Sequence, residues 1–173
     1  MPSAPTPDGQ SSFKALLRAN DLLSEWEQAR PCDAAPIMPM LRTAFNQFVA
    51  EVLSDTHETN LDIVDARDVL RGAAGLAIGC ANASGPCRVQ QALQEAYQNM
   101  QAVGPLTAPQ GRILLLVQSR PDAELKMDEL TDITDTMRRN AGLEWEMVFG
   151  YGIVLNLPAE IRLTFMLAPG SPQ

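Results

Sequence analysis

Residues 38–53 read MPMLRTAFNQFVAEVL and outline one face of a helix. The apolar side chains recur at intervals of three and four residues: Met40, Leu41, Ala44, Phe45, Phe48, Val49, Val52 and Leu53. This periodicity predicts an amphipathic α-helix whose broad apolar stripe needs a large partner. Pro36 and Pro39 precede the stretch and a polar loop, residues 54–60, follows it, so both ends are marked. We expect a sheet to rest on this helix and the preceding residues to cover its other side.

The length of the chain, 173 residues, predicts one domain preceded by a helical segment. Hydrophobic residues make up 46% of the chain, which is enough to bury a core. The net charge of −8 argues against nucleic acid or an anionic membrane as the main partner, because both bind basic patches. No apolar run approaches the length of a membrane span and the N-terminus has no secretory signal, so we expect a cytoplasmic protein.

The cysteines and the histidine predict neither a disulfide framework nor a metal site. Cys32, Cys80 and Cys87 form no pair-like pattern, and His57 is not near a cysteine at metal-ligand spacing. We therefore expect a reduced compartment, no structural zinc and no cofactor. Because no nucleophile is paired with a base, an enzyme in its own right is the weakest functional class for this sequence.

The rest of the chain predicts helices and strands in order. Residues 1–11 read as a disordered tail, and residues 12–37 as an N-terminal helix with a Pro-rich linker. A short helix is expected from about Ile63 to Arg71, ended by Gly72. The next elements are a strand of small residues within 72–83, a helix within 85–101 and an apolar strand at 112–118. They are followed by a helix at 127–142, a strand near 145–149, a strand at 161–167 and a tail at 169–173.

This order, strand–helix–strand–helix–strand–strand, predicts the fold class. The apolar run at 113–117 indicates a strand buried on both faces. Right-handed crossovers would place both connecting helices on one face of the sheet, which leaves the other face for helix 38–53. The sequence therefore predicts an α/β two-layer sandwich with a four-stranded mixed sheet, two helices on one face, the long amphipathic helix on the other and an added N-terminal helix. The glycines of the 72–83 strand indicate that something approaches its backbone closely.

An acidic turn, Asn60-Leu61-Asp62-Ile63-Val64-Asp65, lies before the short helix. Asp62 suits the N-cap, Asp65 falls in the first turn where the helix dipole favours a carboxylate, and Asn60 suits a turn. Helix capping therefore explains the spacing by itself. A functional role for the same carboxylates stays open beside that interpretation.

From about Phe45 to Ala168 the chain resembles the C-terminal half of FtsZ, the bacterial tubulin relative of cell division. The resemblance implies that residues 38–168 form the corresponding domain. The matching motifs come in the same order as in the family: the acidic turn at 60–65, Gly75–Ala81, Pro105-Leu106, Gly111–Leu115, Phe149-Gly150 and Glu160–Thr164. No single motif is specific, but together with the same order of elements they are hard to obtain by chance.

The resemblance gives the acidic turn a function. In FtsZ this loop reaches the GTP held by the next subunit of a filament, and its two aspartates help to position the attacking water. The resemblance implies that Asp62 and Asp65 would orient that water in trans and that Asn60 would support them. No glycine-rich phosphate signature precedes helix 38–53, so we expect no GTP binding and no GTPase activity from this chain alone.

A second expectation concerns the side of helix 38–53 that lies away from the sheet. In FtsZ the central helix packs on both domains, so here one side would be bare. We expect the N-terminal helix to cover it through Phe13, Leu17, Leu23 and Trp26.

Two functions follow. The first is an interaction protein that presents Asn60, Asp62 and Asp65 to an FtsZ-type filament subunit and caps or modulates the filament. The alternative is a stand-alone, self-associating scaffold or ligand-binding domain without a filament role. The two-layer fold also resembles the chorismate-mutase-like class, in which trimers and ligand sites between subunits occur, and fold alone does not decide function.

Overall fold

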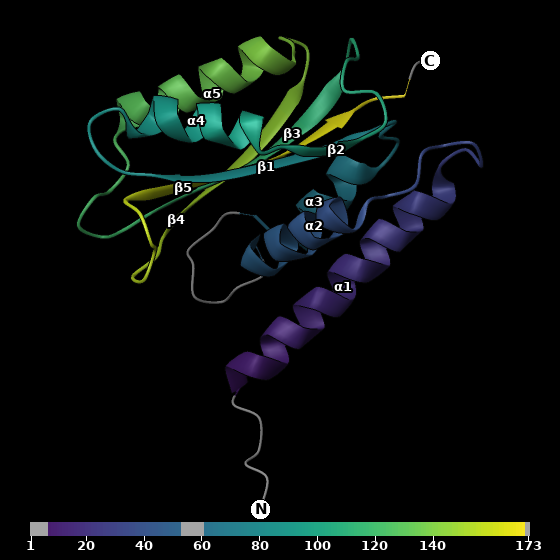
Figure 1. Ribbon diagram of the computed structural model, residues 1–173, viewed down its shortest axis with the longest axis horizontal. Coiled ribbons are helices and arrows are strands. Elements are labelled where there is room, and N and C mark those ends of the chain that lie inside the picture. Colours follow the sequence, from purple (N-terminus) through teal and green to yellow (C-terminus); the bar gives the residue numbers. More distant parts are fainter. Residues whose placement is uncertain (1–6, 53–60, 172–173) are drawn as a thin grey trace, which may run out of the picture.

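The computed structural model describes residues 7–52 and 61–171, which build a sheet covered by helices on both faces (Figure 1). Helices α4 (Arg88–Gln98) and α5 (Met127–Ala141) cover one face, and α2 (Pro39–Val52) and α3 (Ile63–Leu70) lie on the other. This arrangement confirms the predicted α/β sandwich, with both crossover helices on one face. Among the helices that the structure describes, none combines the length and the apolar character needed to cross a membrane.

The sheet is mixed and contains five strands in the order β2-β1-β5-β3-β4. They are β1 (Leu76–Ala83), β2 (Gln101–Val103), β3 (Gly111–Ser119), β4 (Glu146–Ile153) and β5 (Ile161–Pro169). β3 and β4 are parallel and joined through α5, whereas the other neighbours are antiparallel. The sequence predicted four strands, and β2 is the additional one. Its three residues pair with residues 76–78 of β1 but are too few to show the alternation that predicts a strand.

Strand β3 divides the core into two apolar clusters, as its unbroken apolar run predicted. Ile113, Leu115 and Val117 belong to the cluster under α4 and α5. Leu114 and Leu116 belong to the cluster shared with α1, α2 and α3. All five side chains are fully buried, so β3 is covered on both faces.

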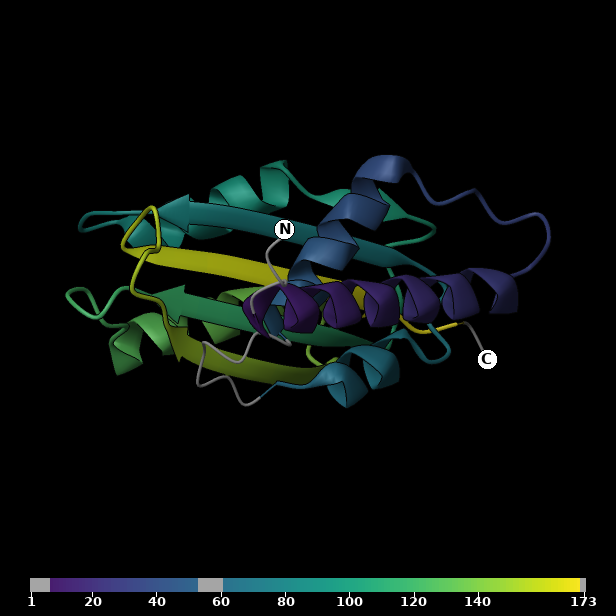
Figure 2. The same ribbon diagram turned by 90° about the horizontal axis from the view of Figure 1, so that it is seen from below.

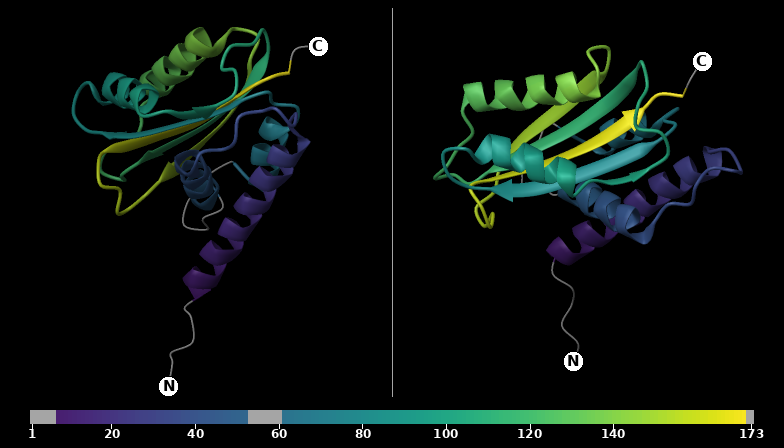
Figure 3. Two further views of the ribbon diagram at one scale, coloured as in Figure 1. Left: turned by 45° about the vertical axis from the view of Figure 1, so that its right-hand side comes forward. Right: turned by 45° about the horizontal axis from the view of Figure 1, so that its top comes forward.

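Helix α1 (Pro7–Ala29) lies on the outer side of α2 and α3, as Figures 2 and 3 show. It begins before residue 12, so residues 7–11, which we assigned to the tail, belong to the helix. The expected cover through Leu23 and Trp26 is confirmed, since both side chains are buried in the cluster shared with α2.

The prediction for Leu17 is wrong, because this side chain is 48% exposed. The buried stripe of α1 includes Ala19 and Leu22 as well as Leu23 and Trp26. The side chains of Leu17 and Ala19 are separated by about 200° around the helix axis, so Leu17 points away from the core. The side chain of Phe13 lies outside the described part of the chain.

Gly79 in β1 lies where α4 packs closely on the sheet, as the small-residue strand predicted. A Cβ at this position would lie 2.4 Å from the carbonyl oxygen of Ala96 and 2.5 Å from the Phe165 ring. Gly79→Ala is therefore expected to lower the free energy of unfolding by about 3 kcal/mol, because the backbone of α4 must move. Urea denaturation measures this loss.

The control for Gly79 is Gly72→Ala, at a residue with φ of +71° where an added Cβ would meet no atom of the described residues within 4 Å. This change is expected to cost about 1 kcal/mol, from the left-handed backbone alone. Equal losses for the two variants would contradict a steric role for Gly79.

Candidate functional site

The two aspartates predicted as site residues lie together at the start of α3. Asp62 is the N-cap residue, and its Oδ1 accepts hydrogen bonds from the backbone N–H of Val64 at 2.7 Å and of Asp65 at 3.2 Å. Asp65 Oδ2 accepts a hydrogen bond from the backbone N–H of Asp62 at 2.8 Å. The two carboxylates thus form a reciprocal capping box, which confirms the capping interpretation.

Capping uses one oxygen of each carboxylate. Asp62 Oδ2 and Asp65 Oδ1 make no further hydrogen bond within residues 7–52 and 61–171. Asp62 is exposed and Asp65 is half-buried. A carboxylate only accepts hydrogen bonds, so these two oxygens can hold a water molecule or a donor from a partner. Asn60, the third predicted site residue, lies outside the described residues.

Leu61 anchors this turn to the sheet. Its side chain is 5% exposed and packs on Gly150 of β4, where a Cβ would lie 2.7 Å from the Leu61 Cγ. Ala66, one turn further along α3, is buried in the same cluster. Leu61 and Ala66 therefore occupy the positions of a hydrophobic staple, which fixes the direction in which the chain enters the helix. No role was predicted for Leu61 from the sequence, although an apolar residue directly before an N-cap is the signal for this anchor.

Arg112 of β3 holds the other end of α3. Its guanidinium donates a hydrogen bond to the carbonyl oxygen of Asp68 and forms an ion pair with Glu146 at 3.2 Å. Asp68 also pairs with Arg71 at 3.5 Å. Together with Asp65 these side chains line an open groove of about 290 Å³ beside α3. The capping turn therefore borders a surface that carries both signs of charge.

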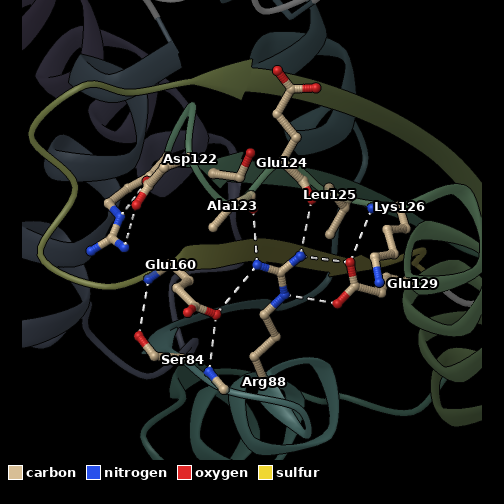
Figure 4. Close-up of polar contacts among 12 residues, drawn as sticks. Ser84, Arg88, Asp122, Ala123, Glu124, Leu125, Lys126, Glu129 and Glu160 are labelled. Atoms are coloured by element: carbon tan, nitrogen blue, oxygen red, sulfur yellow. Dashed lines mark hydrogen bonds and ion pairs between the residues drawn. The ribbon is translucent and has the colours of Figure 1, made fainter.

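A buried arginine that the sequence analysis missed ties the loops at the start of α4 and α5 together. Figure 4 shows Arg88 at the centre of this cluster. Its Nε and Nη2 donate to the two carboxylate oxygens of Glu129, both at 2.7 Å. It also donates to the carbonyl oxygens of Ala123 at 2.9 Å and Glu124 at 3.0 Å, and it lies 3.4 Å from a carboxylate oxygen of Glu160. Arg88 thus connects the start of α4 to residues 123–129 and to Glu160, which are distant from it in sequence.

The ion pair of Arg88 and Glu129 stabilises the charged form of both side chains. The hydrogen bonds from Arg88 hold the pKa of the Glu129 carboxyl below its usual range, and the same contact raises the pKa of Arg88.

One feature of the sequence could have indicated this cluster. A cation in the first turn of a helix is disfavoured by the helix dipole, and Arg88 shares the buried stripe of Ala92 and Ala96.

The other reactive side chains of the described residues do not build a second site. No group of three or more His, Cys, Asp or Glu residues is placed to hold a metal ion in residues 7–52 and 61–171. Burial raises the pKa of the Cys80 thiol, whose sulfur accepts a hydrogen bond from the Thr164 hydroxyl at 3.3 Å. This environment disfavours the thiolate form that a cysteine nucleophile needs.

The fold of this chain is similar to that of solved structures of other proteins. No family model matches the sequence. An empty FtsZ dimer from M. jannaschii superposes with a TM-score of 0.54 at 17% identity, covering 86% of this chain and 43% of that chain. Two further similar structures, both with TM-scores of 0.49, are a W319Y mutant of FtsZ from M. jannaschii and CetZ from Methanosaeta thermophila. They are 17% and 16% identical and cover 80% and 77% of this chain, and 42% and 38% of their own.

The similarity to the empty FtsZ dimer extends over most of this chain but less than half of the FtsZ chain. At 17% identity it is a statement about the fold alone. The element order, the mixed sheet and the helices on both faces agree with it. The chain therefore has the FtsZ/tubulin-like fold, in an α/β arrangement consistent with the C-terminal domain of FtsZ.

Proposed function

We propose that this chain binds a subunit of an FtsZ-type filament through the start of α3 and modulates the filament and its GTP hydrolysis. The observation that carries this proposal is the pair of surface carboxylates of Asp62 and Asp65, each with one oxygen left over from capping, on an FtsZ-like fold. In the family that the sequence resembles, the corresponding loop contacts the GTP of the next subunit. Asn60 is included in the proposed contact on the same resemblance.

The chemistry of phosphoryl transfer suits such a role. The protein contributes mainly by positioning the reacting groups, and a carboxylate can orient the attacking water in line with the phosphate. The capping box holds both carboxylates in place through backbone N–H groups, so their free oxygens are already oriented before a partner binds. In this proposal the chain contributes to hydrolysis only in trans and performs no catalysis alone.

A specific observation favours the alternative, in which the chain is a stand-alone domain without a filament role. The hydrogen bonds of Asp62 and Asp65 are fully explained by the N-terminus of α3, where an N-cap residue contributes about 1 kcal/mol to stability. Under this alternative the carboxylates serve folding alone.

The experiment that separates the two functions uses a charge-removing variant that keeps the cap. Asparagine caps a helix as well as aspartate does, so Asp62→Asn should leave the melting temperature nearly unchanged, whereas Asp62→Ala should cost about 1 kcal/mol. The chain and each variant are mixed with GTP-loaded FtsZ from the same organism, and phosphate release and filament pelleting are measured. We expect the unaltered chain to change both readouts and Asp62→Asn to lose the effect on phosphate release.

Two results would count against the filament role. If the unaltered chain neither binds FtsZ nor changes pelleting or phosphate release, the proposal fails. If binding occurs but Asp62→Asn and Asp65→Asn act like the unaltered chain, the carboxylates have no role in trans and serve only the cap.

A further inference from the structure

Strand β4 forms one border of the sheet and pairs only with β3 among the strands that the structure describes (Figure 2). The outer side of an edge strand presents backbone N–H and C=O groups that can pair with another extended chain. β4 has eight residues, whereas β2 at the opposite border has three. The β4 border is therefore long enough to accept a further strand and the β2 border is not.

Beyond Glu146 at its start, the side chains of β4 lack the features that usually protect an edge. Residues 147–153 contain no charged residue and no proline. The strand keeps an unbroken register with residues 112–119 of β3, so no bulge interrupts it. Phe149 and Ile153 are 42% and 40% exposed. Natural edge strands are commonly blocked by lysine, proline or bulges, and an apolar edge without them tends to pair with another strand.

We propose that β4 pairs antiparallel with β4 of a second copy of this chain, so that two five-stranded sheets join into one. The strand is complementary to itself in the register centred on Gly150. Phe149 of each copy then lies opposite Tyr151 of the other, and Met147 lies opposite Ile153. Aromatic and aliphatic pairs of this kind stabilise neighbouring strands, and the two-fold axis provides each pair twice.

The charge of the chain supports a contact at this border. Two copies that each carry a net charge of −8 repel one another over most of their surfaces. In the proposed register the one charged residue of β4, Glu146, lies opposite Val154 of the second copy, so no like charges face each other. This pairing does not involve Asp62 or Asp65 and does not depend on a filament partner.

Sedimentation of the full chain without any FtsZ tests the pairing. We expect a dimer whose fraction rises with protein concentration. Phe149→Lys should weaken the dimer at least about tenfold, because the change occurs twice in each interface. The matched control is Met40→Lys on α2, which introduces the same charge at a residue that is 63% exposed and should leave dimerisation unchanged. Amide hydrogens of residues 147–153 should exchange more slowly at high than at low concentration.

Other outcomes would overturn the proposal. A monomer at every concentration up to the solubility limit excludes it, and so does a dimer that persists in Phe149→Lys. If circular dichroism shows that Phe149→Lys is unfolded, Ile153→Lys takes its place. A dimer in which the β4 amides are not protected would show that another surface pairs.

Discussion

Leu23→Ala is expected to destabilise the fold by about 2–5 kcal/mol. Leu23 is fully buried in the cluster that joins α1 to α2, α3 and the sheet. Alanine removes most of the side chain and leaves a cavity against this cluster, because closely packed neighbours relax only in part. Urea denaturation followed by circular dichroism measures the loss.

The control for Leu23 lies on the same helix. Leu17→Ala removes the same atoms from a residue that is 48% exposed, so the change should stay within about 0.5 kcal/mol. Similar losses for Leu17 and Leu23 would contradict the face of α1 that is assigned to the core.

Removing the whole helix extends the same test. A chain without residues 1–30 loses the buried side chains of α1 and the hydrogen bond from Trp26 Nε1 to the carbonyl oxygen of Ala73 at 3.1 Å. We expect this protein to bind a hydrophobic dye and to aggregate, because the outer side of α2 becomes apolar surface. An unchanged melting temperature would show that α1 is dispensable for the fold.

The sequence predicted those segments whose own residues carry the whole signal, such as a periodicity, an apolar run or a cap. Helix 38–53 was found as Pro39–Val52, because two prolines and a polar loop mark its ends. The apolar run of β3 required helices on both faces, and this requirement gave the layers of the fold. Asp62 was recognisable as an N-cap because its hydrogen bonds reach residues only two and three positions away.

The features that were missed depend on contacts between distant residues. β2 is defined by its pairing with β1, and three residues carry no period of their own. The partners of Arg88 lie 35 to 72 positions away in sequence, so no local sequence pattern predicts them. The error at Leu17 has a different origin. Several leucines at helical spacing allow more than one stripe, and only packing against α2 and α3 selects one.

The buried Arg88 cluster leads to the second large effect. Arg88→Met keeps an unbranched apolar stem but removes the guanidinium, which leaves the Glu129 carboxylate and the carbonyl oxygens of Ala123 and Glu124 without their partner. Breaking one side of a buried ion pair usually costs about 3–5 kcal/mol. The Glu129 side chain is 20% exposed and can recover some hydration, so we expect a loss of about 3 kcal/mol.

Arg120→Met is the matched control, since the pair of Arg120 with Asp122 has the same chemistry on the surface. That pair has N–O distances of 2.9 Å, but the Asp122 side chain is 68% exposed. Water screens an exposed ion pair, so the stability of this variant should stay close to that of the unaltered chain. The double variant Arg88→Met, Glu129→Gln should lose less than the sum of the two single variants, because neither side is left as an unpaired charge.

The pH dependence of stability gives a further test of the same pair. Because Arg88 lowers the pKa of Glu129 in the folded protein, the pair stabilises the fold above the unfolded glutamate pKa of about 4.3. This stabilisation is lost as the pH falls through the lower folded pKa. The difference in unfolding free energy between the unaltered chain and Arg88→Met should therefore be constant near neutral pH and shrink in acid. A difference that is the same at both ends of this range would mean that Arg88 stabilises the loops through its carbonyl contacts alone, without the carboxylate of Glu129.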